Sequence, residues 1–236
     1  MGRKGNVNRR KERETVERPE RIRKYKYLFL IVCEDQNTEP SYFRSFKSRI
    51  PEETIFLKEV GAGRDPKGVV EQAVTERDAL KERARKTVDT VWVVFDKDDA
   101  DGNATKTQRY KDAFTIAGEN NFKLAHSNEV FELWLLLHLT DVDPEIALPR
   151  HQIYSKLEAL IKALPDHADF SYEHGNAAIL TIIAKAGDEQ AAMQRADALV
   201  EYHGKKDPIL SNPVTHVQEL LKDLYEWIDF YGWKEA

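Results

Sequence analysis

The sequence predicts an α/β protein in which a parallel β-sheet of about four strands is flanked by helices and followed by an α-helical C-terminal half. Two observations indicate this fold. In the first half, short apolar runs rich in strand-forming residues alternate with helical patterns, as in strand–helix–strand units of a parallel sheet. From Asn128 onward no strong strand pattern appears, and the segments have helical spacing.

The predicted elements alternate along the first half and then become helical. The first strand, Tyr27 to Cys33, is a continuous apolar run of the kind found in strands buried on both faces. Pro66 suits the first turn of a helix. The predicted strands are 27–33, 55–60, 90–95 and 123–126, and the predicted helices are 41–49, 66–86, 106–120, 129–139, 151–164, 176–203 and 214–229.

Charge is distributed unevenly along the chain, which has a net charge of -5. Residues 1–26 contain 11 Lys or Arg against 4 Glu, so the rest of the chain is strongly acidic. A basic arm of this kind is typical of contact with a polyanion, although a solvated tail is the simpler alternative. We expect residues 1–24 to be a disordered arm, 25–140 an α/β domain, and 141–236 a helical subdomain packed on it.

Cysteine content and hydropathy indicate where the protein works. Cys33 is the single cysteine, so an internal disulfide is excluded and a reducing, cytoplasmic location is expected. No apolar run approaches the roughly 18 residues of a membrane span.

Acidic residues follow two of the predicted strands. Glu34 and Asp35 come after the first strand, while Asp96 and Asp98 come after the third and would share one side of an extended chain. Ligands of open parallel sheets bind at the carboxyl ends of the strands. Clustered carboxylates repel each other and suit Mg²⁺ or Mn²⁺, so we expect a metal site there, with solvated loop residues as the alternative.

The apolar segment that starts at Glu129 contains a further carboxylate. Glu132 lies in the middle of a helix that should be largely buried, where a lone charge is costly unless it is paired or bound to metal. Asn128 would lie one turn earlier on the same helical face. His138 is rotated by about 120° from that face, so a structural hydrogen bond is expected for it.

Four ordered motifs cover most of the chain, from about residue 26 to 225. They are Cys33-Glu34-Asp35-x-x-Thr38-Glu39-Pro40-x-Tyr42-Phe43, Val94-Phe95-Asp96-x-Asp98, Ser127-Asn128-x-x-Phe131-Glu132-x-Trp134-Leu135-x-x-His138 and Asn212-Pro213-x-Thr215-x-Val217. Together they resemble the RloB-like proteins, which are similar to the Toprim superfamily of nucleases, primases and topoisomerases. The resemblance implies a Toprim-like sheet with Glu34, Asp96 and Asp98 around Mg²⁺. Asp35 stands where the family usually has glycine, which implies either an extra ligand or a changed turn.

The resemblance also implies a function in anti-phage defence and abortive infection, often beside an ATPase. The main hypothesis is therefore a divalent-metal-dependent nuclease acting on RNA, with tRNA among the candidates, or on DNA. Its catalytic residues would be Glu34, Asp96, Asp98 and Glu132, with Asp35 as an additional metal ligand. The residues expected to support them are Glu39, Asp99, Ser127, Asn128 and His138, and those expected to contact nucleic acid are Arg9, Arg10, Lys11, Lys205, Lys206 and His216.

Two other functions stay open at this level. One is a non-catalytic subunit that binds metal or nucleic acid and regulates an ATPase-linked defence complex; a homo-oligomer is a further candidate assembly. The other is a receiver-like phosphate switch, since Glu34-Asp35, Asp96 and Ser127 match its outline. A receiver also needs a fifth strand ending in lysine, and the sequence shows only helical patterns after Asn128.

Overall fold

A computed structural model describes residues 22–234, so nearly all of the predicted basic arm, with Arg9, Arg10 and Lys11, lies outside the described residues. Its centre is a five-stranded sheet in the order β2-β1-β3-β4-β5. The strands are β1 (Tyr27–Cys33), β2 (Ile55–Gly61), β3 (Thr90–Asp96), β4 (Lys123–Asn128) and β5 (Val214–Thr215). The first four are parallel, as predicted, and β5 pairs with β4 in the antiparallel direction.

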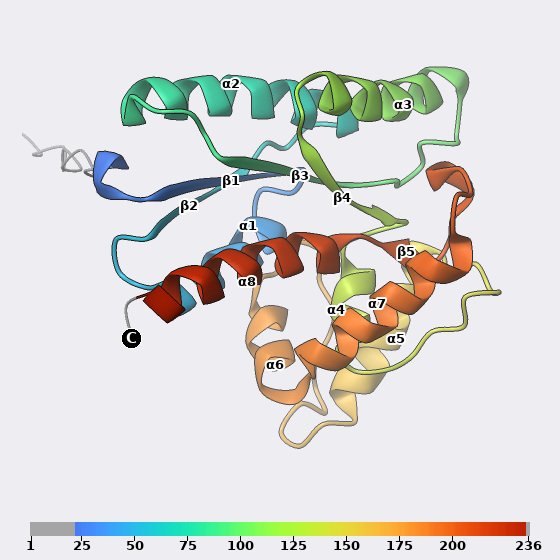
Figure 1. Ribbon diagram of the computed structural model, residues 1–236. Helices are drawn as coiled ribbons and strands as arrows, with labels where there is room; N and C mark the ends of the chain where they lie inside the picture. Colours follow the sequence, from blue (N-terminus) through green and yellow to red (C-terminus); the bar gives the residue numbers. More distant parts are fainter. Residues whose placement is uncertain (1–21, 235–236) are drawn as a thin grey trace, which may run out of the picture.

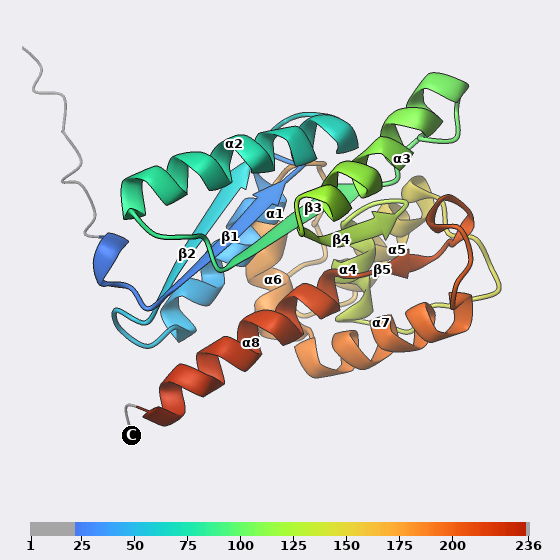
Figure 2. The same ribbon diagram turned by 45° about the horizontal axis from the view of Figure 1, so that its top comes forward.

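Strand β1 is buried along its whole length because helices cover both faces of the sheet (Figure 1). Its alternate residues divide between two cores. Leu28, Leu30 and Val32 pack with α2 (Pro66–Ala84) and α3 (Ala104–Glu119) on one face. Phe29 and Ile31 belong to the core on the other face. Figure 2 shows α2 and α3 lying across one side of the strands.

The second face carries most of the remaining helices. They are α1 (Thr38–Arg44), the 3₁₀ turn η2 (Ser45–Arg49), α4 (Glu132–Leu137), α5 (Arg150–Lys162), α6 (Ala178–Ala186), α7 (Glu189–His203) and α8 (Val217–Lys234). The short helix α4 is fully buried, with Leu133 to Leu137 at 0% exposure. A hydrophobic core continues across residue 140, because it joins β1 and β3 residues to α5, α7 and α8.

Four helical predictions differ from the structure. The helix expected over 41–49 is α1, which begins at Thr38, followed by the 3₁₀ turn η2. The helix expected over 129–139 begins only at Glu132, because Asn128 still belongs to β4. The helix expected over 176–203 is two helices, since Gly187 packs against His138 and the Asp188 side chain caps α7 by accepting from the Ala191 amide at 2.9 Å. The segment expected to be helical from residue 214 first forms β5.

The C-terminal helix α8 lies against the sheet. The ring of Trp227 is 4.1 Å from the ring of Tyr27, measured between centroids. The carboxylate of Asp223 accepts from Trp92 Nε1 at 2.7 Å and pairs with Lys123 at 2.8 Å. Within residues 22–234, no helix combines the length and the apolar character needed to cross a bilayer.

Backbone hydrogen bonds hold together the loops that leave the carboxyl ends of the strands. The Glu34 amide donates to Val94 O at 2.9 Å, and the Lys97 amide donates to Ser127 O at 2.8 Å. The amide of Asp98 donates to Glu129 O at 3.0 Å. The residues after β1, β3 and β4 are therefore fixed beside one another at one edge of the sheet.

Candidate active site

Glu34 joins the ends of two neighbouring strands. It follows β1, and its Oε2 accepts a hydrogen bond of 2.8 Å from the Asp96 amide at the end of β3. Burial raises the pKa of Glu34 to about 8, although that amide favours the ionised form, and the charge of Asp98 adds to the increase. Near neutral pH this carboxyl therefore holds a proton for part of the time.

Asp96 has a buried carboxylate oxygen among the acidic side chains of the site. Part of the residue is exposed, but its Oδ1 is buried and has no hydrogen-bond partner among residues 22–234. Burial raises the pKa of Asp96 well above its usual range, and the charges of Glu39 and Glu34 raise it further. A buried carboxylate oxygen without a donor is costly, so this position favours a proton or a bound cation.

Glu39 lies among the acidic side chains of the site and does not only support them from outside. The residue is in the first turn of α1 and only 1% exposed. Its Oε2 accepts from the Asp35 amide at 3.1 Å. Burial and the charge of Glu34 raise the pKa of Glu39, and among its charged neighbours Glu39 has the largest effect on the pKa of Asp96. Glu39 was expected only to support the metal ligands. The sequence signal for its position is Pro40, which directly follows it and is typical of the start of a helix.

Glu132 reaches the cluster from the start of α4 and is 4% exposed. Its Oε1 accepts from the hydroxyl of Tyr172 at 2.5 Å and lies 3.6 Å from Nδ1 of His174. The nearby carboxylate of Glu132 raises the pKa of His174. Tyr172 and His174 belong to the loop between α5 and α6, for which the sequence carries no periodic signal, and neither was predicted.

Asp98 reaches the cluster by a different geometry from the one predicted. Its φ of 48° takes the chain out of the extended conformation, so it does not share a strand face with Asp96. Its Oδ1 lies 3.0 Å from Nη1 of Arg150. Burial raises the pKa of Asp98, and Arg150 opposes that increase. The charge of Asp98 nevertheless contributes to the raised pKa values of Asp96 and Glu34.

Two further predicted acids make local contacts. Asp35 Oδ1 accepts from the Gln36 amide at 2.7 Å, and its Oδ2 accepts from the Thr38 amide, so both oxygens hold the turn before α1. Of the two roles that the missing glycine implied for Asp35, these hydrogen bonds place its side chain in the turn. Asp99 is exposed and pairs with Lys106.

The remaining predicted support residues bind the surrounding chain. Ser127 Oγ lies 2.9 Å from Thr215 Oγ1 in the β4–β5 pair. Asn128 Nδ2 donates to Pro208 O at 3.0 Å, and because Asn128 ends β4 it does not share a helical face with Glu132. His138 Nδ1 lies 2.9 Å from Trp134 O, which is the structural hydrogen bond expected for it.

The predicted nucleic-acid residues of the described region lie near the end of α7 and after β5. Lys205 and Lys206 are exposed in the loop after α7. His216 stacks on the buried His126, with ring centroids 4.2 Å apart, and its Nδ1 lies 3.1 Å from Glu219 Oε1.

The donor set matches the chemistry of a hard cation. Carboxylate oxygens are the ligands that Mg²⁺ and Mn²⁺ prefer, and Asp96 Oδ1 has no other partner in the described part of the chain. In residues 22–234, no three His, Cys, Asp or Glu side chains are already arranged to hold a metal ion. The residues Glu34, Glu39, Asp96 and Glu132, which we call the acidic cluster, thus fit a cation by composition, while side-chain rotation is needed to form its coordination sphere.

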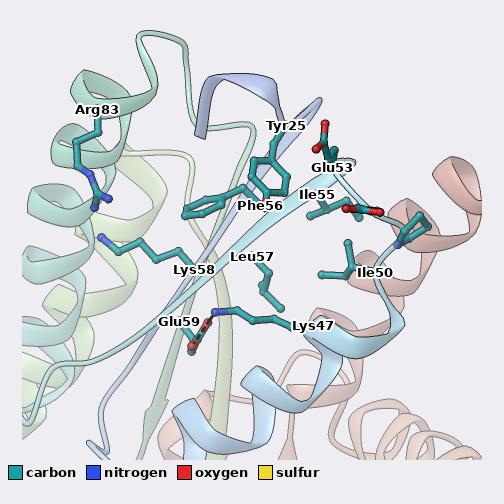
Figure 3. A pocket seen from close by; sticks show the side chains of 12 residues that line it. Tyr25, Lys47, Ile50, Glu53, Ile55, Phe56, Leu57, Lys58, Glu59 and Arg83 are labelled. Carbon is teal, nitrogen blue, oxygen red and sulfur yellow. Dashed lines mark hydrogen bonds and ion pairs between the residues drawn. The ribbon is translucent and has the colours of Figure 1, made fainter. Parts of the chain in front are cut away.

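A cavity of about 550 Å³ lies away from the acidic cluster, along the outer edge of β2 (Figure 3). Two of its lysines are already paired with carboxylates. Lys47 lies 2.8 Å from Glu59 Oε2, and Lys58 lies 2.5 Å from Glu76. Because it holds no residue of the acidic cluster, we do not assign the chemistry to it.

Comparison with known proteins gives one result. The family model described as RloB-like protein matches residues 29–224, which include the whole acidic cluster. Neither the curated proteins nor the solved structures gave a match.

Proposed function

The chain belongs to the family of RloB-like proteins, and from this membership and the acidic cluster we propose that it is a divalent-metal-dependent nuclease. The observation that supports the proposal most strongly is Asp96 Oδ1, a buried oxygen without a donor among the described residues, surrounded by further carboxylates. Such a group is stabilised by a bound cation.

Asp96 would hold Mg²⁺ or Mn²⁺ together with Glu39, Glu34 and Glu132, and Asp98 would join them if it leaves Arg150. When bound, the ion would neutralise charge on the scissile phosphate and lower the pKa of a water molecule. Asp35 is not included, because backbone amides occupy both of its oxygens.

Two side chains of the site suit proton transfer. Glu34, if it does not bind the ion itself, would accept a proton from attacking water at a carboxylate oxygen once the metal has displaced its own proton. His174, whose pKa the nearby Glu132 carboxylate raises, would donate a proton to the leaving oxygen. In this proposal Glu132 also orients His174.

The substrate class follows from the acidic reaction centre together with basic residues elsewhere in the chain. We propose RNA, with tRNA included, or DNA as substrate, and anti-phage defence in the cytoplasm, beside an ATPase, as the setting. Purified protein with Mg²⁺ or Mn²⁺ would be incubated with tRNA, single-stranded RNA, single-stranded DNA and duplex DNA, with and without the proposed ATPase partner. We expect cleavage of at least one substrate by the wild-type protein and none by Asp96→Asn; cleavage by both would contradict the assignment.

One observation favours the second candidate, a non-catalytic regulatory subunit. Arg150 already neutralises Asp98 at 3.0 Å, as in a site that needs no ion. If the protein is a regulatory subunit, the Asp96→Asn variant should change the activity of the ATPase partner as the wild-type protein does. If it is a nuclease, the variant should still bind the partner but should no longer cleave nucleic acid. The receiver-like alternative is not pursued, because β5 is antiparallel and is followed by His216 instead of ending in lysine.

A further inference from the structure

A groove of about 490 Å³ lies between α3 and the loop that follows α7. Its volume falls within the range of small-molecule sites, which is about 300–1,000 Å³. We call it the lysine–aromatic groove, after the residues that line it: Tyr110, Lys111, Phe114, Lys205, Lys206 and Pro208, together with Asp207.

The three lysines make the groove a site for anions. Lys111, Lys205 and Lys206 are exposed, and within residues 22–234 no ion pair or hydrogen bond of their ammonium groups was found. The one carboxylate of the groove is already engaged, because Asp207 Oδ1 accepts from the Ile209 amide at 3.0 Å. Three positive charges that have no partner in the described part of the chain therefore face one small space.

The aromatic wall is held in place by other rings. Phe114 is half-buried on α3, and its ring centroid lies 5.1 Å from that of His126 and 5.7 Å from that of Phe95, both edge-on. Tyr110 lies 5.2 Å from Phe114. A fixed ring at the wall of a cationic groove is the arrangement on which nucleobases stack.

The loop that carries the lysines is also anchored. Gly204 ends α7 with a φ of 54° and a ψ of -121°, a conformation that favours glycine. His203 Nε2 lies 3.0 Å from Pro213 O, which closes the base of the loop. The position of Lys205 and Lys206 is therefore set by the fold.

The groove and the acidic cluster are neighbours. Asn128, at the carboxyl end of β4, donates to Pro208 O at 3.0 Å and to Ile209 O at 3.2 Å. On the other wall, the charges of Asp96 and Asp207 both act on the pKa of the buried Tyr110 hydroxyl. The groove therefore lies beside the strand ends that carry the acidic cluster.

We propose that the lysine–aromatic groove binds an unpaired nucleotide of the nucleic acid, with its base on Phe114 and its phosphates on Lys111, Lys205 and Lys206. This inference rests on the proposed nuclease function and extends it by assigning single-stranded segments as the substrate class. A paired base cannot stack on a side chain without leaving its duplex, so the groove selects against duplexes.

The test measures binding without cleavage. Fluorescence anisotropy with labelled 12-residue single-stranded RNA and DNA, and with the matching duplexes, would be recorded in EDTA at several salt concentrations. We expect the double variant Lys205→Glu, Lys206→Glu to bind single strands at least about tenfold more weakly and to lower the log–log salt slope by about 1.4, which is the loss of two phosphate contacts. Phe114→Leu should weaken single-strand binding roughly fivefold or more and leave duplex binding unchanged.

The matched control is Lys81→Glu, Lys185→Glu, which reverses two exposed lysines on α2 and α6. It should bind like the wild-type protein. The inference would be overturned if the control and the groove variants weakened binding equally, or if the groove variants bound like the wild-type protein. It would also be overturned if the wild-type protein did not bind at all, or if Phe114→Leu weakened duplex binding as much as single-strand binding. Groove-dependent binding without cleavage in Mg²⁺ or Mn²⁺ would contradict the nuclease proposal alone.

Discussion

Carboxylates at the acidic cluster and on the nearby surface have opposite environments. On the surface, each of four aspartates has a basic partner that lowers its pKa, the pairs being Asp65–Arg109, Asp99–Lys106, Asp101–Lys97 and Asp112–Lys67. In the cluster, burial raises the pKa of Glu34, Glu39 and Asp96, and none of these three has a basic partner within residues 22–234.

A lack of nearby basic side chains does not explain this difference. Lys97 lies between Asp96 and Asp98 in the sequence, yet its Nζ pairs with Asp101 at 2.7 Å. A fold that places a lysine beside the cluster and turns it away leaves these acids buried without a neutralising cation, at a cost in stability. Such a cost is typical of functional sites, and here it would be relieved by a metal ion.

The largest expected effect is on the cleavage rate, and it compares Asp96 of the acidic cluster with Asp99 on the surface. Asp96→Asn should reduce the initial cleavage rate by about a thousandfold or more, because it removes the proposed central metal ligand. Asp99→Asn, which removes a carboxylate paired with Lys106 at the surface, should keep the rate within about twofold. Rates would be measured on the best substrate of the panel, and equal loss in both variants would contradict the distinction.

The second prediction concerns pH in metal-free protein. Glu34, Glu39 and Asp96 keep protons in the folded state at pH values where the unfolded chain has lost them. The free energy of unfolding should therefore fall as the pH rises from about 5 to about 8, by about 1 kcal/mol per pH unit for each proton retained. The stabilisation is complete below the usual carboxyl pKa and is lost as the pH passes the folded-state values.

Chemical denaturation in EDTA at several pH values would measure this slope. Saturating Mg²⁺ should flatten it, since the ion displaces the protons, and Asp96→Asn should make it shallower. A stability that rises with pH over this range would show that the cluster is not protonated in the folded state.

The third prediction concerns Glu132, the cluster acid with a hydroxyl donor. Tyr172→Phe should lower the free energy of unfolding by about 1–2 kcal/mol, because the buried carboxylate loses its 2.5 Å hydrogen bond. Tyr154→Phe is the control, since Tyr154 stacks on Tyr172 with 4.6 Å between ring centroids. Equal losses in the two variants would indicate that removing either tyrosine hydroxyl lowers the stability, and not the hydrogen bond to Glu132 in particular.

The smallest effect concerns Arg150. Arg150→Gln removes the cation that competes for Asp98, and a half-exposed ion pair is worth up to about 1 kcal/mol. The apparent dissociation constant for Mg²⁺ should therefore fall about twofold to fivefold. Arg109→Gln, which breaks the surface pair with Asp65, should leave it unchanged; weaker metal binding by Arg150→Gln would instead assign Arg150 to the binding site.

Much of the fold was predictable because parallel strands buried on both faces leave continuous apolar runs. Four strands were found within one or two residues of their ends for this reason. Strand β5 was not predicted, since two residues, Val214–Thr215, carry no periodicity and are a strand only through pairing with β4. The break at Gly187 was missed because it depends on packing against His138.

The candidate site was predictable where strand ends determine it. Glu34 and Asp96 meet because neighbouring parallel strands end at the same edge, and family resemblance led to the same residues. Arg150, Tyr172 and His174 come from the C-terminal half, and their contacts with Asp98 and Glu132 depend on tertiary packing. The left-handed turn at Asp98 likewise has no signal in the spacing of the two aspartates.

Metal binding by the acidic cluster is the central claim, and a Mn²⁺ titration followed by electron paramagnetic resonance tests it without relying on cleavage. Wild-type protein should remove free Mn²⁺ from solution with saturable stoichiometry, and Mg²⁺ should displace it. Asp96→Asn should leave Mn²⁺ free at the same concentrations, while Asp99→Asn should bind like the wild-type protein. Equal Mn²⁺ binding by wild-type and Asp96→Asn protein, or none by either, would contradict the account.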